Sequence, residues 1–282
     1  MSRPWILVCP SSRGIGHALT RHLLRTTTAP ILATARRDPS AVKELLLGGI
    51  GHGHGDDAAA QRERLTVVRA DVTDEPTVEA ASLEAARLFP RETHHLRLGF
   101  AIPGVLRAEK SPAQVDAADA LMTYRVNALG PLLLMKWFGD FLPRKSTQFL
   151  EGDGDGDGDR AGGVRLPGHA VWMSMSARVG STSDNRKGGW YSYRSSKAAV
   201  NSLVKSFDHQ LVSRCGDKAM ALAYHPGTVK TDLSRDFWEG IPDEKLFTPE
   251  YAVERMVEVA TGKVGLQGRG RCWDWKGEEI LP

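Results

Sequence analysis

The chain has 282 residues, of which 41% are hydrophobic and 25% charged, and 37 Lys and Arg against 34 Asp and Glu give a formal net charge of +3 at pH 7. This balance is typical of a soluble globular protein with enough chain for a full core. Because charges of both signs are mixed along nearly the whole length, the sequence predicts neither a nucleic-acid partner nor a membrane partner.

Three cysteines, Cys9, Cys215 and Cys272, stand far apart and form no C-x-x-C pair. This spacing argues against a disulfide framework or a zinc site and suits a reducing compartment. The N-terminal residues lack the basic and then apolar layout of a signal peptide, and no stretch approaches the roughly 18 apolar residues of a membrane span. We therefore expect a cytoplasmic protein.

Short apolar runs with strand character alternate with longer segments of helical period. This alternation predicts βαβ units around a parallel sheet that is buried on both faces. The expected strands are residues 5–8, 31–35, 65–70, 97–102, 170–175, 220–225 and 271–275. We predict an α/β protein in which residues 1–282 form a single Rossmann domain, with a doubly wound seven-stranded parallel sheet and helices on both faces.

Two segments interrupt this alternation, residues 48–64 and 151–163, and both are predicted to be flexible surface insertions. The second contains four residues that match the opening of a calcium-binding loop, Asp153, Asp155, Asp157 and Gly158. The closing Glu of such a loop is missing, because Val164 stands in its place. His52 and His54 lie in a Gly-rich tract that holds ligands poorly, so no metal site is predicted.

A phosphate-binding turn follows the first expected strand and leads into a segment of helical period. Its predicted contacts to a cofactor are Ser12, Arg13, Gly14, Ile15 and Gly16. The two glycines let backbone N–H groups approach a pyrophosphate, and the helix N-terminus adds a favourable partial positive charge. An ordinary strand-to-helix turn is the alternative, but the position after the first strand favours the phosphate site.

Arg36 and Arg37 stand at the end of the second expected strand, where a fold that selects NAD places an acidic residue for the ribose 2′-hydroxyl. Together with Arg13 they suit a 2′-phosphate, because a guanidinium pairs with phosphate at two points. NADP(H) is therefore the expected cofactor, and NAD(H) is the alternative. After the third strand, Asp71 and Val72 are placed to contact the adenine, with a helix-capping role for Asp71 as the alternative.

The most specific signal is the pair Tyr193 and Lys197, which opens an apolar-striped helical segment. Being four residues apart, both side chains project from the same face of a helix. A phenol with a pKa of about 10 is a poor acid or base at neutral pH unless its anion is stabilised, which a nearby ammonium does. Tyr191 has Ser195 rather than a lysine four residues on, so Tyr193 is the candidate acid/base.

Other polar and turn residues follow strands at the same edge of the predicted sheet. Ser174 and Ser176 end one strand, where a hydroxyl can bind a substrate carbonyl oxygen, and Pro226 and Gly227 follow the next. In open α/β sheets the ligand lies beyond the carboxyl ends of the strands. We therefore expect these residues and the glycine turn to meet at one site.

In these motifs the chain resembles the classical short-chain dehydrogenases/reductases over essentially its whole length. Within that family it looks most like the C-factor and sniffer-like carbonyl reductase branch. The stretches that carry the resemblance to this branch are residues 176–181, 184–185, 188–194, 225–229 and 273–277. The resemblance implies an oxidoreductase that uses NADP(H) on a carbonyl or alcohol.

The resemblance also implies roles for individual residues. Tyr193 is expected to donate a proton to the carbonyl, Lys197 to bind the nicotinamide ribose and stabilise the tyrosinate, and Ser176 to orient the substrate oxygen. Asn127 matches the fourth catalytic position, which helps to hold a water linked to the lysine. The remaining cofactor contacts are implied for Gly104, Pro226, Gly227, Val229 and Thr231.

Three departures from the family pattern affect this assignment. The first glycine of the cofactor turn is replaced by Pro10, which lacks a backbone donor. Residues 101–104 read Ala-Ile-Pro-Gly where the family has Asn-Asn-Ala-Gly. The family spacing places Ala177 at the position of the usual catalytic serine, and Ser176 stands one residue earlier. Ser176 is the first candidate for the catalytic serine, and Ser174 is the second.

Two functions follow from these observations. The first is an NADP(H)-dependent oxidoreductase that transfers hydride between the nicotinamide and a carbonyl or alcohol substrate, with Tyr193 moving the proton. The second is a cofactor-sensing signalling protein of the same fold with little or no catalytic activity, which Pro10 and the lost amides motivate. Residues 231–249 are expected to form a substrate lid, apolar enough to favour an aldehyde, ketone or aromatic alcohol. The family resemblance implies a homodimer or homotetramer, although some members of the branch are monomers.

Overall fold

The computed structural model describes residues 1–49, 55–150 and 163–282. His52 and His54 lie outside these ranges, as do the four residues of the calcium-like motif, Asp153, Asp155, Asp157 and Gly158. None of the helices in the described ranges is both long and apolar enough to cross a membrane.

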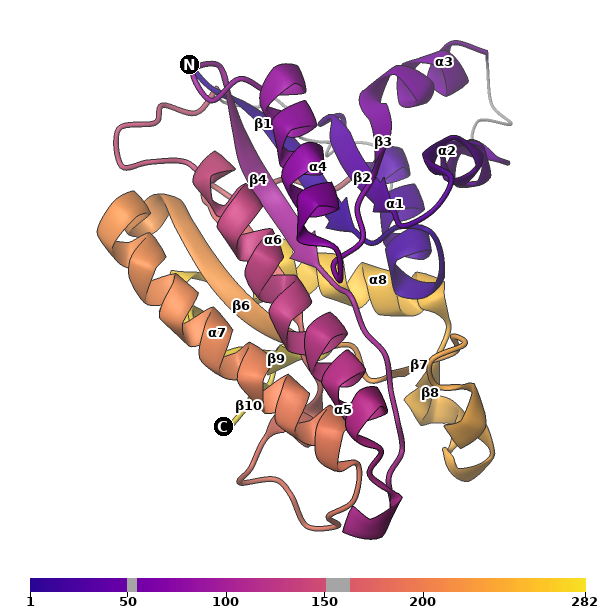
Figure 1. The fold of residues 1–282 in the computed structure, drawn as a ribbon. Helices are drawn as coiled ribbons and strands as arrows, with labels where there is room; N and C mark the ends of the chain where they lie inside the picture. The colour runs from indigo at the N-terminus through magenta and orange to yellow at the C-terminus, as the bar shows by residue number, and fades with distance from the viewer. Residues whose placement is uncertain (50–54, 151–162) are drawn as a thin grey trace.

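Within the described ranges, eight strands form one sheet in the order β3-β2-β1-β4-β5-β6-β9-β10 (Figure 1). The strands are β1 (Arg3–Cys9), β2 (Ile31–Ala35), β3 (Leu65–Arg69), β4 (His94–Ala101), β5 (Ala170–Met175), β6 (Ala219–His225), β9 (Cys272–Asp274) and β10 (Glu279–Ile280). The first seven pair in parallel, which confirms the predicted fold class. The strand order reverses between β1 and β4, and folds of this kind bind their ligands at that switch point.

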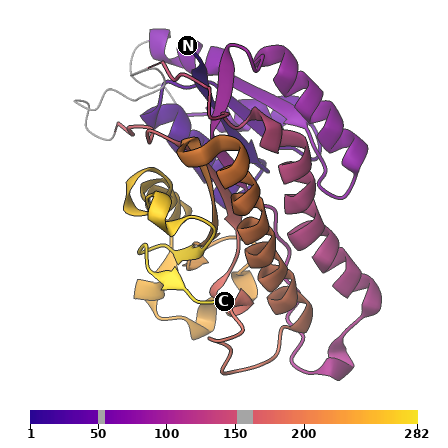
Figure 2. The ribbon, with the colours of Figure 1, turned by 90° about the vertical axis from the view of Figure 1, so that its left-hand side faces the viewer.

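Helices cover both faces of the sheet. They are α1 (Gly14–Thr26), α2 (Pro39–Leu47), α3 (Gly55–Arg64), α4 (Glu75–Leu88), α5 (Ala117–Tyr124), α6 (Gly130–Phe138), α7 (Tyr191–Cys215) and α8 (Pro249–Glu258). A π-helical turn, η2 (Arg125–Leu129), joins α5 and α6 into one continuous rod. Figures 1 and 2 show this rod side by side with α7, while α8 lies across the sheet from them.

The two faces of the sheet bury two separate apolar clusters, because side chains alternate along each strand. In β1, Ile6 and Val8 face the cluster that α1, α2 and α8 cover. Trp5 and Leu7 face the opposite cluster, which α4, α6 and α7 cover. This two-sided burial explains why the strands read as continuous apolar runs in the sequence rather than as alternating ones.

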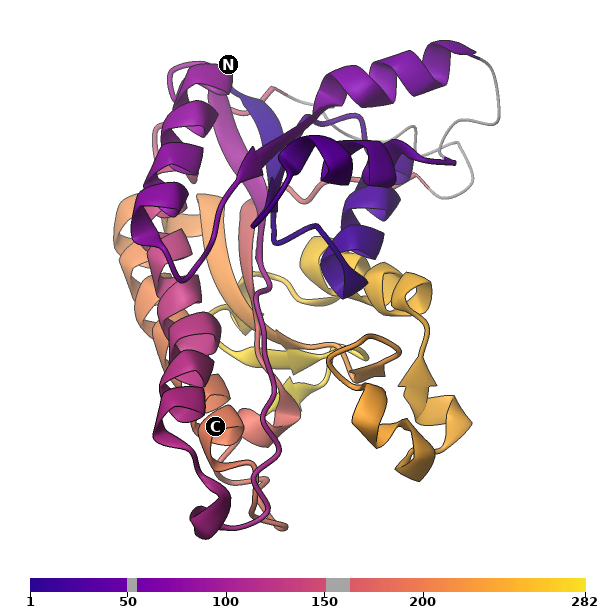
Figure 3. The same ribbon diagram turned by 45° about the vertical axis from the view of Figure 1, so that its right-hand side comes forward.

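Two features of the sheet differ from the sequence prediction. β10 adds an eighth strand, antiparallel to β9, through the pairs Glu279–Trp273 and Ile280–Cys272. A separate two-stranded sheet forms where β7 (Thr228–Val229) pairs in parallel with β8 (Leu246–Phe247). Both features consist of pairings of two residues, which are too short to leave a periodic signal. Figure 3 shows the gold segment of β7 and β8 standing at the carboxyl ends of the strands.

Part of the first predicted insertion is helical in the structure. Its second half forms α3, and Arg62 on this helix pairs with Glu44 of α2, with 2.6 Å between Nη2 and Oε2. Arg64 donates hydrogen bonds to the carbonyls of Leu24 (2.8 Å) and Ala29 (3.0 Å). These contacts attach the end of the insertion to α1 and α2.

Candidate active site

Helix α7 brings together the two residues of the most specific motif. Tyr193 and Lys197 both face the sheet and are 8% and 1% exposed. The Lys197 Nζ lies 5.8 Å from the centroid of the Tyr193 ring. It donates a hydrogen bond of 2.8 Å to the carbonyl of Met175, the last residue of β5. The pair therefore sits at the carboxyl end of the sheet, as the spacing predicts.

Burial sets the protonation of this pair. It lowers the pKa of Lys197 from 10.5 to about 7, and it raises the pKa of Tyr193 from 10.0 to about 12. Both shifts have the same cause, because a low-dielectric environment disfavours the charged form of either group. Near neutral pH the phenol therefore keeps its proton, while the lysine gains and loses one readily.

Asn127 lies in the π-helical turn η2 and is fully buried. Its Oδ1 accepts a hydrogen bond from the Val105 N–H (2.8 Å), and its Nδ2 donates to the Val105 carbonyl (2.9 Å) and to the Ser196 Oγ (3.1 Å). Gly104 precedes Val105, and a Cβ built on it would lie 4.0 Å from the Lys197 Nζ. Asn127 thus ties the loop after β4 to α7 beside the lysine. Such π-helical turns occur frequently at functional sites.

The hydroxyls of the two candidate serines both contact protein groups. Ser174 Oγ accepts a hydrogen bond of 3.1 Å from the Trp172 indole N–H. Ser176 Oγ donates to the Asn201 Oδ1 (2.6 Å) and to the Lys197 carbonyl (3.3 Å). The alternation of side chains along a strand explains these contacts, because the even-numbered residues of β5 face α7. Ser176 therefore lies beneath α7, with its proton directed to Asn201.

The glycine turn after β1 has the shape that an anion site requires. Gly14 adopts a left-handed φ of +55°, and a Cβ on Gly16 would come within 1.8 Å of the Pro10 carbonyl oxygen, so only glycine fits there. Helix α1 begins without a side-chain cap from Arg13 and without an acidic residue in its first turn. Its first N–H groups are therefore open to a bound anion. A Cβ on Gly14 would lie 3.4 Å from Thr231, which places that predicted residue beside the turn.

Arg36 and Arg37 are exposed directly after β2. Asp71 follows β3, and its Oδ1 accepts hydrogen bonds from the N–H (2.9 Å) and the hydroxyl (2.7 Å) of Thr73. Burial raises the pKa of Asp71, but the Thr73 hydrogen bonds and the charges of Arg36 and Arg69 outweigh it, and the net shift is downward. The Asp71 carboxylate and both arginines thus lie at neighbouring strand ends. One oxygen of the carboxylate, Oδ1, already accepts the hydrogen bonds from Thr73.

The Pro-Gly turn after β6 packs against the glycine turn after β1. Gly227 has a φ of +76°, and a Cβ on it would lie 2.5 Å from the Phe247 ring and 3.2 Å from Trp275. Val229 and Phe247 form a small apolar cluster against which Ile15 of the glycine turn packs. Of the other predicted cofactor residues, Pro226 is buried, and Ser12 and Val72 are partly buried. The fold therefore gathers the predicted cofactor residues at the carboxyl ends of the strands.

An aromatic cluster that sequence reasoning missed lies beside Tyr193. The Trp190 ring meets the Tyr193 ring edge-on, with centroids 6.0 Å apart, and lies 4.9 Å from the Phe237 ring. Phe237 belongs to a 3-10 turn, η6 (Arg235–Gly240), in the segment predicted to be a lid. The sequence gives little indication of this role for Trp190, because a tryptophan next to two glycines belongs to no helical or strand pattern. Its left-handed φ of +53° is visible only in the structure.

Comparisons with known proteins agree with this fold. No protein-family model matches the chain. Over 166 residues the chain is 33% identical to the C-signal of Myxococcus xanthus, which covers 59% of this chain and 80% of that protein. It is also 29% identical over 264 residues to the 1-hydroxy-2-glutathionyl-2-methyl-3-butene dehydrogenase of Rhodococcus sp. strain AD45, covering 90% of this chain and 88% of that protein.

Solved structures with the same fold include a carbonyl reductase with bound NADPH from chicken fatty liver, with a TM-score of 0.76, 24% identity and full coverage of both chains. The carbonyl reductase Sniffer of D. melanogaster has a TM-score of 0.75 at 20% identity, again with full coverage. A mainly parallel sheet with a glycine turn and a buried Tyr-Lys pair defines a dinucleotide-binding α/β protein. The chain belongs to the short-chain dehydrogenase/reductase family, which confirms the predicted membership.

Proposed function

We propose that this protein is an NADP(H)-dependent oxidoreductase that transfers a hydride between the nicotinamide and the carbon of a carbonyl or alcohol substrate. The observation that carries this proposal is the buried Tyr193 and Lys197 pair at the carboxyl ends of the strands, with Gly104 beside the lysine. Two similar proteins support it by name, one a dehydrogenase and the other a carbonyl reductase with bound NADPH.

The residues present fit NADP(H). The glycine turn and the uncapped start of α1 suit the pyrophosphate, and Asp71 and Val72 suit the adenine. Arg13, Arg36 and Arg37, all exposed, suit the 2′-phosphate. When bound, the cofactor supplies or accepts the hydride. NAD(H) is the alternative that the binding experiment below distinguishes.

The residues of this chain then handle the proton and the geometry. With its pKa raised to about 12, Tyr193 holds a proton at neutral pH and donates it to the carbonyl oxygen. Lys197 stabilises the tyrosinate that results and binds the ribose. Asn127 holds the loop after β4 against α7. Since the Ser176 proton points to Asn201, we propose that Ser176 supports the active site by holding α7 rather than by direct contact with substrate.

A titration of the purified protein with NADPH and with NADH in parallel tests the proposed function. The tryptophan and bound-nicotinamide fluorescence report binding, and a panel of aldehydes and ketones then reports NADPH oxidation. We expect preferential binding of NADPH and reduction of at least one apolar carbonyl. Binding of neither nucleotide would overturn the proposal.

The double substitution Arg36→Ala/Arg37→Ala is expected to weaken NADPH binding by about 10- to 100-fold, because hydrogen bonds to a charged phosphate contribute about 1.5–3 kcal/mol. The Kd for NADH is expected to stay unchanged, since NADH lacks the 2′-phosphate. Arg87→Ala, at an exposed position on α4, serves as the control. Equal weakening for both nucleotides would show that the arginines do not select the phosphate.

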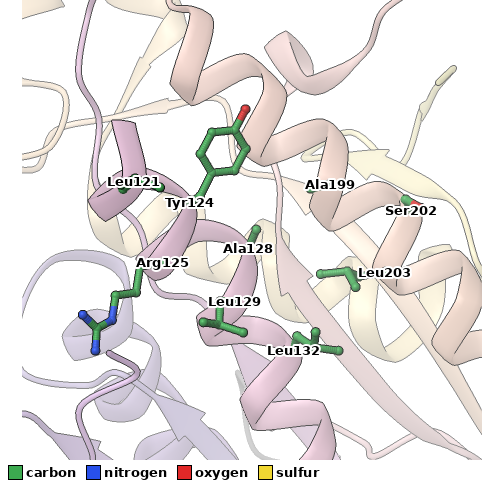
Figure 4. Close-up of a pocket in the computed structure, with 9 residues that line it drawn as sticks. All are labelled: Leu121, Tyr124, Arg125, Ala128, Leu129, Leu132, Ala199, Ser202 and Leu203. Carbon is green, nitrogen blue, oxygen red and sulfur yellow. The ribbon is translucent and has the colours of Figure 1, made fainter. Parts of the chain in front are cut away.

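We also propose that the protein forms a homodimer through an apolar groove of about 590 Å³ between the α5–α6 rod and α7. The groove is lined by Leu121, Tyr124, Arg125, Ala128, Leu129, Leu132, Ala199, Ser202 and Leu203. Figure 4 shows Leu129 and Leu132 from the rod and Leu203 from α7 standing along it. Leu121, Leu129 and Leu132 are 70%, 44% and 42% exposed, and apolar patches of this kind mark association surfaces.

Leu129→Glu is expected to convert the dimer to a monomer, because a dimer would bury the new carboxylate in an apolar groove. Light scattering coupled to size-exclusion chromatography measures the mass. Leu83→Glu, at a position 65% exposed on α4, is the matched control and should leave the mass unchanged. A wild-type protein that is already monomeric at high concentration would contradict this interface.

A further inference from the structure

Helix α7 begins in an unusual way for a helix that carries a candidate proton donor in its first turn. Its N-cap residue is Trp190, which provides no side-chain cap, and no acidic residue follows in the first turn. Gly188, Gly189 and Trp190 adopt φ angles of +63°, +67° and +53° in succession. A left-handed tryptophan is strained, and such strain persists only where surrounding contacts hold it. Tyr193 lies three residues after this turn.

Glu109, in the loop after β4, supplies the contacts that this helix start lacks. Its backbone carbonyl accepts a hydrogen bond of 2.5 Å from the Trp190 N–H, and its Oε1 accepts one from the Ser192 hydroxyl. A Cβ on Gly189 would lie 3.3 Å from the Glu109 carbonyl oxygen, so the two loops pass close together. Glu109 thus holds the backbone of Trp190 and the side chain of Ser192 at the start of α7.

Glu109 is buried, so its contact with Ser192 belongs to the packed interior of the protein and not to its surface. The residue is 7% exposed, and its Oε2 is buried without a hydrogen-bond partner among the described residues. Burying a half-satisfied carboxylate is unfavourable for stability, and buried polar groups of this kind require an explanation. A carboxylate at a helix N-terminus also interacts favourably with the helix dipole, which accounts for its location.

Arg194 holds the same turn from its other side. Its Nε donates hydrogen bonds to the carbonyls of Gly188 (3.2 Å) and Gly189 (3.0 Å), and its Nη1 donates to the carbonyl of Val179 (3.3 Å). The left-handed turn is therefore fixed between Glu109 and Arg194. Its last residue, Trp190, contacts the ring of Tyr193.

We propose that Glu109 is a positioning residue that fixes the Tyr193 phenol through Ser192 and Trp190. The proposal rests on the proposed function, in which Tyr193 donates the proton. Glu109 does not contact the reacting atoms in this scheme. It holds the turn that precedes Tyr193, and reaction rates are sensitive to displacements of about 1 Å in such groups.

The test compares Glu109→Ala, Glu109→Gln, Ser192→Ala and the double variant Glu109→Ala/Ser192→Ala. Glu79→Ala, at an exposed position on α4, is the matched control. We expect Glu109→Ala to lower kcat for carbonyl reduction by about 10- to 100-fold, with the Kd for NADPH unchanged. Glu109→Gln, which keeps an acceptor for Ser192, should recover most of this loss. The double variant should be no slower than Glu109→Ala, because each single change already breaks the same hydrogen bond between Glu109 and Ser192.

Hydrogen exchange provides a readout that does not depend on catalysis. Amides of residues 190 and 194–196 are expected to exchange at least about 10-fold faster in Glu109→Ala and in Ser192→Ala than in wild type, because the helix start opens locally. If Glu109→Ala fails to fold, Ser192→Ala alone tests the contact. Unchanged exchange and kcat in that variant would overturn the proposal. A wild-type protein that binds no nucleotide would instead overturn the proposed function, while the exchange data still test the positioning role.

Discussion

Replacement of Tyr193 by Phe is expected to lower kcat for carbonyl reduction by about 10²- to 10⁴-fold, the range that general acid catalysis contributes. Phe keeps the ring that packs against Trp190 and lies near the Lys197 ammonium. It removes only the hydroxyl that donates the proton in the proposed function. The Kd for NADPH should therefore stay within about 2-fold of wild type, since the phenol proton takes no part in cofactor binding.

Tyr191→Phe is the matched control for this experiment, because Tyr191 lies two residues away on the same helix and is 42% exposed. We expect that variant to keep wild-type kcat. The same pair of variants separates the two functions that the sequence predicts. If the protein were a cofactor sensor, Tyr193→Phe would leave partner control intact, because nucleotide binding persists. Reductase activity that survived Tyr193→Phe unchanged would contradict the proposed role of the phenol.

Replacement of Lys197 by Met is expected to abolish most of the reductase activity and, at the same time, to raise stability in acid and neutral solution. Activity falls, by about 10²-fold or more, because the tyrosinate loses its nearby cation. Stability rises because the wild-type ammonium is buried, with 1% of the residue exposed. A methionine fills the same space without a charge to desolvate.

The sign of the pH dependence follows from the lowered pKa of Lys197. Folding lowers it from 10.5 to about 7, so between these values the unfolded chain binds more protons than the folded one. The free energy of unfolding of the wild type therefore increases as the pH rises through this window. The gain in stability of Lys197→Met should be largest below about pH 7 and should disappear above about pH 10.5.

Thermal unfolding of both proteins at about pH 6 and about pH 9 measures this effect. The increase in Tm caused by Lys197→Met should be larger at the lower pH. Lys205→Met, at an exposed position on the same helix, is the control and should show the same change in Tm at both values. A stability difference for Lys197→Met that did not vary with pH would show that the lysine is not desolvated by folding.

The strands and the pairing of Tyr193 with Lys197 belong to what the sequence by itself determined. The seven parallel strands are buried on both faces, so they appear as continuous apolar runs that need no partner to be recognised. Tyr193 and Lys197 could be paired because the helical repeat places residues four apart on one face. The glycine turn was recognisable for a similar reason, since Gly16 meets a local requirement for close approach to the Pro10 carbonyl. In each case the information lies within one element or one turn.

Only the tertiary structure decided the contacts between segments that are distant in the sequence. Ser176 has the residue type and the strand-end position of a substrate contact, yet its proton goes to Asn201 because the packing of α7 on β5 sets which groups face it. Glu109 precedes Ser192 by 83 residues, and no periodicity links a loop residue to a distant helix start. β10 and the β7–β8 ladder pair over two residues each, where strand propensity is too weak to act without neighbours. Local patterns determine elements and their internal faces, whereas hydrogen-bond partners across elements depend on how those elements pack.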